Sequence, residues 1–139
     1  MPSPAFRLET NVTADDDTSS GAGSSAGTLR SVSIACSPDT SGVAALVDLV
    51  ASPEVKVRDG DRWTAYAASD LTLALAGPSE IPAGAAVSLN IKVTDVSAVR
   101  AALLAAGAKA CGDLVTGDHE VRAAVWLTDA VVLTAYQPI

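Results

Sequence analysis

Small polar side chains recur at every second position in several stretches that alternate like β-strands. Serine alternates with Val32 and Ile34 near residue 32, and polar residues alternate with larger aliphatic ones over residues 87–93. Neighbouring side chains of a strand point to opposite faces of a sheet, so the polar set is expected to share one face. Its members are Ser31, Ser33, Thr72, Ser88, Asn90, Lys92, Thr134 and Tyr136. Small hydroxyl and amide side chains leave room for a ligand and supply hydrogen bonds to it.

Aromatic residues make up only 4% of the chain, so each one is a candidate for ligand contact. An offset of about 60 residues, at which the sequence pattern repeats, relates Tyr66 to Trp126. These two side chains are predicted to sandwich a planar ligand, with stacking worth about 0.5–1.5 kcal/mol per contact. Trp63 is a further candidate for an aromatic wall, but it lies three residues before Tyr66 and is expected to point to the opposite face of their strand. Packing of either tryptophan in the core or in a dimer interface is the alternative.

Few side chains offer acid–base or nucleophilic chemistry, and no catalytic residue is assigned. Lys92 is a candidate to bind a ligand carboxylate or, if desolvated, to act as a base; a solvated lysine at a strand end is the alternative. The only histidine, His119, is expected to be exposed beside a turn. Cys36 and Cys111 have no metal-type spacing and are expected to be buried free thiols.

The elements that must position these residues occur twice. Residues 29–77 and residues 85–138 each have the pattern of a strand, a helix and three further strands. In the second copy, Asp95 is expected to cap the helix and Gly107 to end it. One such unit buries little apolar surface alone, so the two copies are expected to share a sheet. The predicted fold class is α+β, with two tandem βαβββ repeats forming a cupped, half-barrel mixed sheet.

Length and composition limit the domain organisation and the partners. The 139 residues are expected to form one domain over residues 29–139, preceded by a flexible arm, residues 1–28, rich in Ser, Gly and Asp. The formal net charge is -7, and no basic patch is visible, so nucleic acid and anionic membranes are not expected partners. The first residues lack the pattern of a signal peptide, so a cytoplasmic location is expected.

Two stretches of the second copy resemble the vicinal oxygen chelate superfamily, which includes glyoxalase I, extradiol dioxygenases, fosfomycin-resistance enzymes and bleomycin-resistance proteins. Residues 91–112, IKVTDVSAVRAALLAAGAKACG, are similar to the family's strand, "DV" helix start and "AAGA" helix exit. Residues 128–138, TDAVVLTAYQP, are similar to its last turn and strand. In the first copy the helix is short and the usual aromatic motifs after it are missing. The resemblance covers about 110 residues and implies a homodimer.

Metal-dependent members of that superfamily take ligands from the first and last strand of each repeat. Carried onto this chain, the resemblance implies the positions Ser31, Ala74, Ser88 and Thr134, with Leu75 or Thr72 as alternatives to Ala74. None of these residues is His, Glu or Asp. Divalent metals require charged or imidazole ligands, so neither a metal nor any other cofactor is expected.

These observations favour a metal-free protein that binds a small organic molecule, resembling bleomycin-resistance proteins, which sequester a drug without altering it. The acidic balance suits a polar or cationic aromatic compound. The expected ligand-binding residues are the polar set together with Tyr66 and Trp126. The first alternative is a metal-independent isomerase or lyase of a small carbonyl compound that uses Lys92, Tyr136 or Tyr66. The second is an interaction protein whose two halves close on each other without a cavity.

Overall fold

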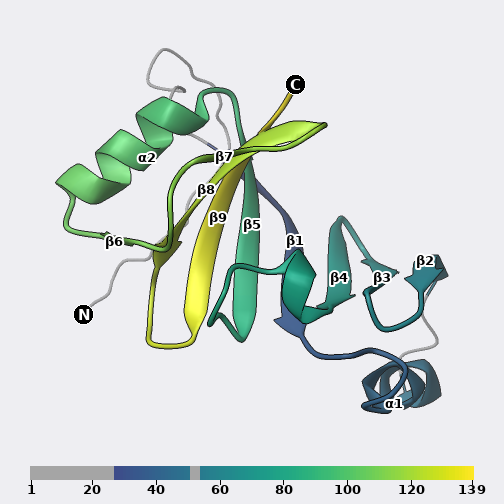
Figure 1. Ribbon diagram of the computed structural model, residues 1–139. Coiled ribbons are helices and arrows are strands. Elements are labelled where there is room, and N and C mark those ends of the chain that lie inside the picture. The colour runs from purple at the N-terminus through teal and green to yellow at the C-terminus, as the bar shows by residue number, and fades with distance from the viewer. Residues whose placement is uncertain (1–26, 51–53) are drawn as a thin grey trace.

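One curved mixed sheet organises the molecule (Figure 1). The computed structural model describes residues 27–50 and 54–139. Within these ranges nine strands form the sheet, in the order β2-β3-β4-β1-β5-β9-β8-β6, with β7 paired to β8. The arm predicted over residues 1–28 lies outside the described residues except for its last two, which belong to the first strand.

The two halves of the chain use the same order of elements. The first half contains β1 (Gly27–Ala35), α1 (Val43–Val50), β2 (Glu54–Asp59), β3 (Trp63–Ala68) and β4 (Leu71–Ala76). A short 3-10 helix, η4 (Pro78–Glu80), follows. The second half contains β5 (Val87–Val93), α2 (Val96–Ala105), β6 (Lys109–Ala110), β7 (Val115–Thr116), β8 (Glu120–Trp126) and β9 (Val131–Pro138). Each first strand is parallel to the last strand of its half, and antiparallel pairing of β1 with β5 joins the halves. The predicted α+β class with two βαβββ units in a half-barrel sheet is confirmed.

The helices lie at opposite ends of the sheet and cover its outer, convex face (Figure 1). Between α1 and the sheet, the buried side chains of Ala44 from the helix and of Tyr66 and Leu75 from the strands form one core cluster. Between α2 and the sheet, a second cluster contains Val96 and Val99 from the helix and Val93, Ala123 and Ala135 from the strands. Apolar side chains on the outer face of the strands therefore hold the helices, and the small polar side chains lie on the opposite, concave face, here called the cup. No helix in the described ranges is long and apolar enough to cross a membrane.

Local signals place α2 where the sequence predicted it. The Asp95 carboxylate accepts a hydrogen bond from the Ala98 amide at 3.0 Å, which caps the first turn. Gly107 ends the helix at a φ of 102°, in the left-handed region that glycine adopts without strain. Val96 and Val99 belong to the apolar stripe of the helix and are buried against the sheet.

The chain after α2 departs from the prediction. A strand near residues 109–115 is expected from the sequence, but the structure has two strands of two residues each, β6 and β7, with residues 111–114 between them. Gly112 has a φ of 77°, which interrupts an extended backbone. The segment between the two strands consequently bends over the cup, where it forms one wall of a cleft.

Candidate functional site

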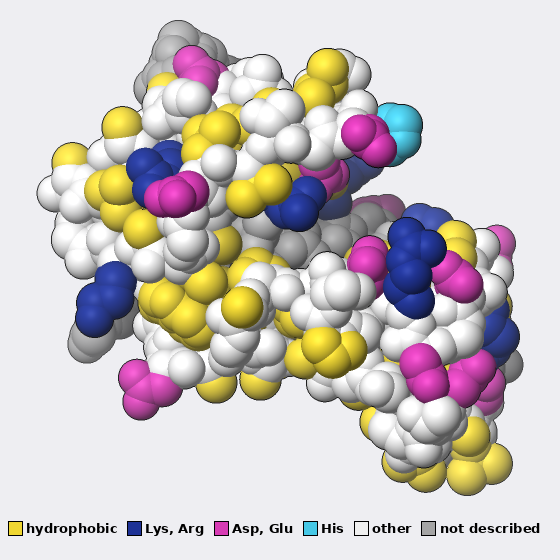
Figure 2. Space-filling view, viewed as in Figure 1, with side chains coloured by type: hydrophobic (Ala, Val, Ile, Leu, Met, Phe, Trp, Pro, Cys, Tyr) yellow, Lys and Arg dark blue, Asp and Glu magenta, His cyan; other side chains and the backbone are white. Residues whose placement is uncertain are grey.

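The cup contains a cleft of about 640 Å³. Figure 2 shows the surface hollowed between the side formed by α2 and β6–β8 and the side formed by β1–β4. The floor comes from β1, β5, β9 and β8, and the walls come from residues 79–83, residues 111–113 and Val115. The first half contributes little besides β1, because Trp63 is the only residue of β2–β4 that lines the cleft. The site therefore belongs mainly to the second half and the central strand β1.

Five polar side chains form a continuous hydrogen-bonded network on the floor. Thr134 Oγ1 lies 2.8 Å from Ser88 Oγ, and Ser88 Oγ donates to Asn90 Oδ1 at 2.8 Å. Asn90 Nδ2 donates to Ser31 Oγ and to Ser33 Oγ, both at 2.9 Å. Three members are almost fully buried, and all five line the cleft. A satisfied network of this kind holds its side chains in fixed positions.

Strand register brings this network together. Ser33 is paired with Ser88 across the β1–β5 ladder, and Ser31 with Asn90. Asn90 is paired with Thr134 across β5 and β9. Cross-strand partners have Cβ atoms about 4.5–5.5 Å apart on the same face, so short hydroxyl and amide side chains can bond each other directly.

The wall over residues 79–83 is fixed to the first half by a close approach of the backbone. A side chain at Gly77 would meet the carbonyl oxygen of Asp61 at 2.6 Å, so only glycine fits there. Beyond it, Glu80 accepts hydrogen bonds from Ser79 at 3.1 Å and from Arg62 at 3.3 Å. These contacts hold the Glu80 carboxylate at the cleft.

The lining has an acidic balance. Three carboxylates, those of Glu80, Asp113 and Glu120, face one guanidinium, that of Arg122. Arg122 lies 3.6 Å from Glu120 in a partly exposed ion pair. Arg62, which pairs with Glu80, is not itself a lining residue. A positively charged ligand is therefore favoured over an anion by the charges of the lining.

Tyr136 lines the cleft beside the floor network. Burial raises the pKa of its phenol, and the negative charge of Glu120 adds to that effect, while Arg30 opposes it. The phenol is consequently protonated at neutral pH and is available as a hydrogen-bond donor.

Six of the ten residues named from the sequence line the cleft: Ser31, Ser33, Ser88, Asn90, Thr134 and Tyr136. The structure places the other four elsewhere. Lys92 is exposed and outside the lining. Thr72 lies on the cup face of β4, away from the cleft, and accepts a hydrogen bond from Lys56 Nζ at 2.9 Å.

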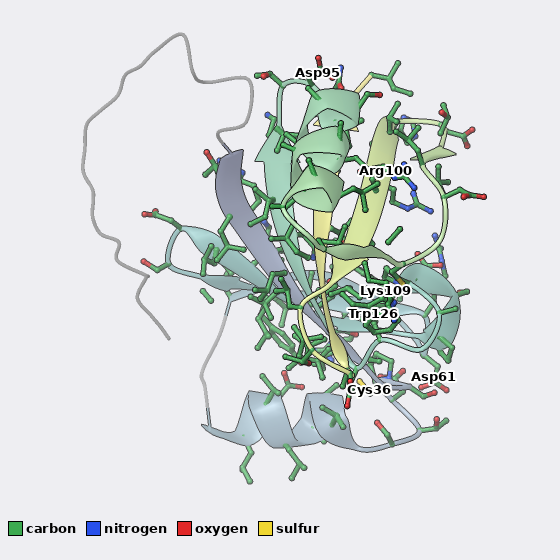
Figure 3. All side chains as sticks on the ribbon, turned by 90° about the vertical axis from the view of Figure 1, so that its left-hand side faces the viewer. Cys36, Asp61, Asp95, Arg100, Lys109 and Trp126 are labelled. Carbon is green, nitrogen blue, oxygen red and sulfur yellow. The ribbon has the colours of Figure 1, made fainter. Side chains whose placement is uncertain are left out.

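The expected aromatic pair of Tyr66 and Trp126 is corrected by the structure. Tyr66 lies on the outer face, packed under α1, where its hydroxyl donates to the carbonyl oxygen of Ala44 at 3.3 Å. Trp126 lies on the cup face but outside the lining, against the cluster of Ile81 and Val132. Figure 3 shows it beside Lys109, its partner across β6 and β8.

Trp63 is the tryptophan that lines the cleft, although it is not among the ten residues expected to bind the ligand. Trp63 begins β3 and is paired with Ala76 at the end of β4, whereas Trp126 ends β8 and is paired with Val132 near the start of β9. The two indoles therefore lie at opposite ends of their hairpins, although both pack against the same core cluster. The signal was present in β3. Trp63 alternates with the small Ala65, as expected for the cup face, whereas Tyr66 has the parity of the outer face.

The thiols and the histidine have ordinary environments. Cys36 and Cys111 are free and half-buried, and burial raises the pKa of both thiols. Cys111 lines the cleft, and Cys36 lies near Asp61 before α1 (Figure 3). His119 is exposed and does not line the cleft.

Comparison with known proteins identifies the fold. No protein-family model matches the chain, and no curated protein matches it by sequence. Among solved structures, a glyoxalase/bleomycin resistance protein/dioxygenase superfamily member from Vibrio splendidus 12B01 superposes with a TM-score of 0.60 at 20% identity, over 79% of this chain and 99% of that one. The chain has the vicinal oxygen chelate fold.

Proteins with quite different names share this fold with the chain. Methylmalonyl-CoA epimerase from Mycobacterium tuberculosis has a TM-score of 0.56 at 16% identity, over 87% of this chain and 93% of that one. A structure described as a NAD-dependent benzaldehyde dehydrogenase from Legionella pneumophila has a TM-score of 0.60 at 15% identity, over 78% of this chain and 98% of that one. A vicinal oxygen chelate fold at such identities does not determine an activity, which must be argued from the site.

The donor set does not fit the divalent metal that many proteins of the vicinal oxygen chelate fold use. The implied positions hold the hydroxyls of Ser31, Ser88 and Thr134 and the methyl group of Ala74. The three hydroxyls already bond within the floor network. Within residues 27–50 and 54–139, no group of three or more His, Cys, Asp or Glu side chains is placed to hold a metal ion. The function is therefore argued from the side chains of the cleft alone.

Proposed function

We propose that this protein binds a small polar or cationic aromatic compound in the cleft and sequesters it without altering it, as the sequence resemblance to bleomycin-resistance proteins implies. The observation that carries the proposal is the cleft of about 640 Å³ that combines a hydrogen-bonding floor, an indole wall and an acidic rim. A few polar groups set among apolar walls are typical of small-molecule sites. The proposed polar contacts are Ser31, Ser33, Ser88, Asn90, Thr134 and Tyr136.

Charge and aromatic surface favour a cation with a planar ring. Trp63 lines the cleft together with Glu80, Asp113 and Glu120, so an indole and negative charge share one cavity. An ammonium group over an indole gains about 0.5–2 kcal/mol, depending on how far both groups are desolvated. A ring stacked on Trp63 adds a contribution of similar size.

The competing function, a metal-independent isomerase or lyase of a small carbonyl compound, has weaker support. Of the three acid–base groups considered for it, Tyr66 lies under α1 and Lys92 lies outside the cleft. Tyr136 lines the cleft, but burial raises the pKa of its phenol, so it suits the donation of a proton better than the removal of one. Binding without chemistry requires none of these groups to ionise.

Tryptophan fluorescence tests the proposal directly, because the chain has two tryptophans and only Trp63 lines the cleft. A Trp126→Phe variant leaves Trp63 as the sole reporter. Titration of this variant with a panel of aromatic amines, amidines and quaternary ammonium compounds is expected to quench or shift the emission with saturation. Absence of a saturable response to the whole panel, with the variant folded, would refute the proposal.

A cytoplasmic homodimer is part of the same proposal. Leu46 and Leu49 on the free side of α1 are 64% and 80% exposed, and Val55 on the neighbouring edge strand β2 is also exposed. Figure 2 shows apolar side chains gathered at the end of the molecule where α1 lies. Apolar side chains grouped in this way mark association surfaces. Light scattering on the wild type and on a Leu46→Glu, Leu49→Glu variant measures whether this surface supports a dimer.

A further inference from the structure

We infer that Asn90 fixes the direction of every hydrogen bond on the floor of the cleft, so that Ser31 and Ser33 present their hydroxyl hydrogens to an acceptor oxygen of the ligand. This inference rests on the proposed function and deepens it, because it assigns a carbonyl or amide oxygen to the ligand and gives that oxygen a place to bind.

The direction begins at the Asn90 carboxamide. Its nitrogen donates one hydrogen to Ser31 Oγ and the other to Ser33 Oγ, each at 2.9 Å. Its oxygen accepts from Ser88 Oγ at 2.8 Å. An amide nitrogen has two hydrogens and no acceptor capacity, so Asn90 uses its full donor capacity on the two serines of β1.

The same count determines the other end of the network. A serine hydroxyl has one hydrogen, and Ser88 gives it to Asn90. The contact of 2.8 Å between Ser88 Oγ and Thr134 Oγ1 therefore requires Thr134 to donate. Donation runs in one direction, from β9 through β5 to β1.

Ser31 and Ser33 are the end of this chain of donors. Both accept from Asn90, and neither hydroxyl donates to an acceptor within the part of the chain that the structure describes. Both line the cleft, and both oxygens lie within hydrogen-bond distance of one nitrogen, so the two free hydrogens are close together. Two convergent donors, strengthened by the bonds behind them, form a site for an acceptor oxygen.

The charges of the cleft decide which oxygen fits. In the lining, the carboxylates of Glu80, Asp113 and Glu120 outnumber the one guanidinium, that of Arg122, and this balance disfavours a carboxylate or phosphate. A neutral carbonyl or amide oxygen accepts the two hydrogen bonds without that repulsion. The ligand class is accordingly an aromatic cation that also has a carbonyl group.

Two probes separate the carbonyl contribution from the rest: para-acetylbenzylammonium and para-ethylbenzylammonium. They share the ring and the positive charge and differ in the carbonyl oxygen. The wild type is expected to bind the acetyl probe about tenfold more tightly, the size of one to two net hydrogen bonds. In a Ser31→Ala, Ser33→Ala variant the ratio of the two dissociation constants is expected to fall to about one.

Asn90→Asp is the sharper variant, because it keeps the shape and reverses only the two hydrogen bonds to Ser31 and Ser33. A carboxylate accepts hydrogen bonds and donates none, so the hydroxyls of Ser31 and Ser33 must donate to the new carboxylate. Both probes are expected to bind more tightly because of the added negative charge, while the preference for the acetyl probe disappears. A Thr72→Val variant, changed on the cup face outside the cleft, is the matched control and is expected to keep the preference.

The outcomes separate the inference from the proposed function. Binding of both probes to the wild type with a ratio near one, or an undiminished preference in Asn90→Asp, overturns the inference alone. Binding of neither probe counts against the proposed function, and nuclear magnetic resonance of the full chain then decides the inference. The Asn90 amide hydrogens are expected to show proximity to the β-hydrogens of Ser31 and Ser33. Proximity to Ser88 and Thr134 instead would reverse the donors and overturn it.

Discussion

Trp63 and Trp126 pack against the same core cluster, yet only Trp63 lines the cleft. Trp126 packs against Ile81 and Val132, and its ring lies within 4 Å of the position that a side chain on Gly84 would take. Two tryptophans that pack against one cluster therefore differ in their surroundings, since one lines the cleft and the other is used for packing alone.

The two tryptophans give the first prediction. Trp63→Phe is expected to weaken binding of a responding aromatic cation about threefold to tenfold, because phenylalanine offers a smaller and less electron-rich face than indole. Trp126→Phe is expected to leave the affinity within twofold of the wild type. Calorimetry, which needs no fluorophore, compares the two variants. Equal losses of affinity would show that Trp63 has no special place in the site.

Much of the floor could be predicted from the sequence, because strict alternation identifies a face without knowledge of the partners of a strand. Ser31 and Ser33 on β1, and Ser88 and Asn90 on β5, line the cleft as the alternation indicates. The direction of donation through Asn90 could not be predicted in this way. It depends on which strands are neighbours and in what register, and those are tertiary facts.

The aromatic wall was predicted wrongly because a constant offset between the halves was assumed. The turn between β8 and β9 is longer than the turn between β3 and β4, so the offset changes within the hairpin. With Val132 aligned to Thr72, the counterpart of Trp126 is Ala67 rather than Tyr66. The wall at residues 111–113 and Val115 was missed for a different reason. Gly112 was interpreted as part of a continuing strand, whereas its positive φ turns the chain over the cup.

The position of Tyr66 gives a second prediction. Its hydroxyl donates to the Ala44 carbonyl under α1, so Tyr66→Phe is expected to lower the free energy of unfolding by about 0.5–1.5 kcal/mol. Ligand affinity is expected to be unchanged, because the side chain lies on the outer face of the sheet. Urea unfolding and the fluorescence titration measure the two effects. A loss of affinity with intact stability would contradict the placement.

The floor network gives a third prediction, about two variants that each delete one hydroxyl. Ser88→Ala removes the donor to the half-buried Asn90 and the acceptor for the buried Thr134, and it is expected to destabilise the fold by about 1–3 kcal/mol. Thr134→Val removes only the terminal donor and keeps the shape, so its expected cost is about 1 kcal/mol. Urea unfolding of both variants tests the order. A larger cost for Thr134→Val would contradict the direction of donation.

The two tyrosines give a fourth prediction, for alkaline pH. Burial raises the pKa of both Tyr66 and Tyr136. The unfolded chain ionises near the ordinary tyrosine value of about 10. Stability is therefore expected to be constant with respect to these groups below that pH, and to fall as pH rises from it toward the folded-state values.

Near-ultraviolet absorbance of tyrosinate measures this titration, because the sequence contains only these two tyrosines. No step is expected at the ordinary pKa while the protein is folded. Tyr66→Phe and Tyr136→Phe assign the remaining signal to one phenol. In each variant one phenol remains. If that phenol ionises at or below the ordinary tyrosine pKa while the protein is folded, its burial is contradicted.

The loop that leads into α1 gives the last prediction, for acid pH. Asp61 accepts hydrogen bonds from the backbone amides of Thr40 at 2.8 Å and Asp39 at 2.9 Å, and it lies beside this loop in Figure 3. These bonds, first of all the one from Thr40, lower the pKa of the carboxyl. A lowered folded-state pKa stabilises the fold above the unfolded value of about 3.9, and this contribution is lost as pH falls through the folded-state pKa.

Asp61→Asn is therefore expected to lower the melting temperature at neutral pH, because a neutral amide oxygen accepts these bonds more weakly than a carboxylate. The difference from the wild type is expected to shrink as the pH is lowered past the titration of Asp61. Asp70→Asn, at the exposed turn between β3 and β4, is the matched control and is expected to leave the melting temperature unchanged. A difference between Asp61→Asn and the wild type that persists unaltered at acid pH would mean that the carboxylate charge does not hold the loop.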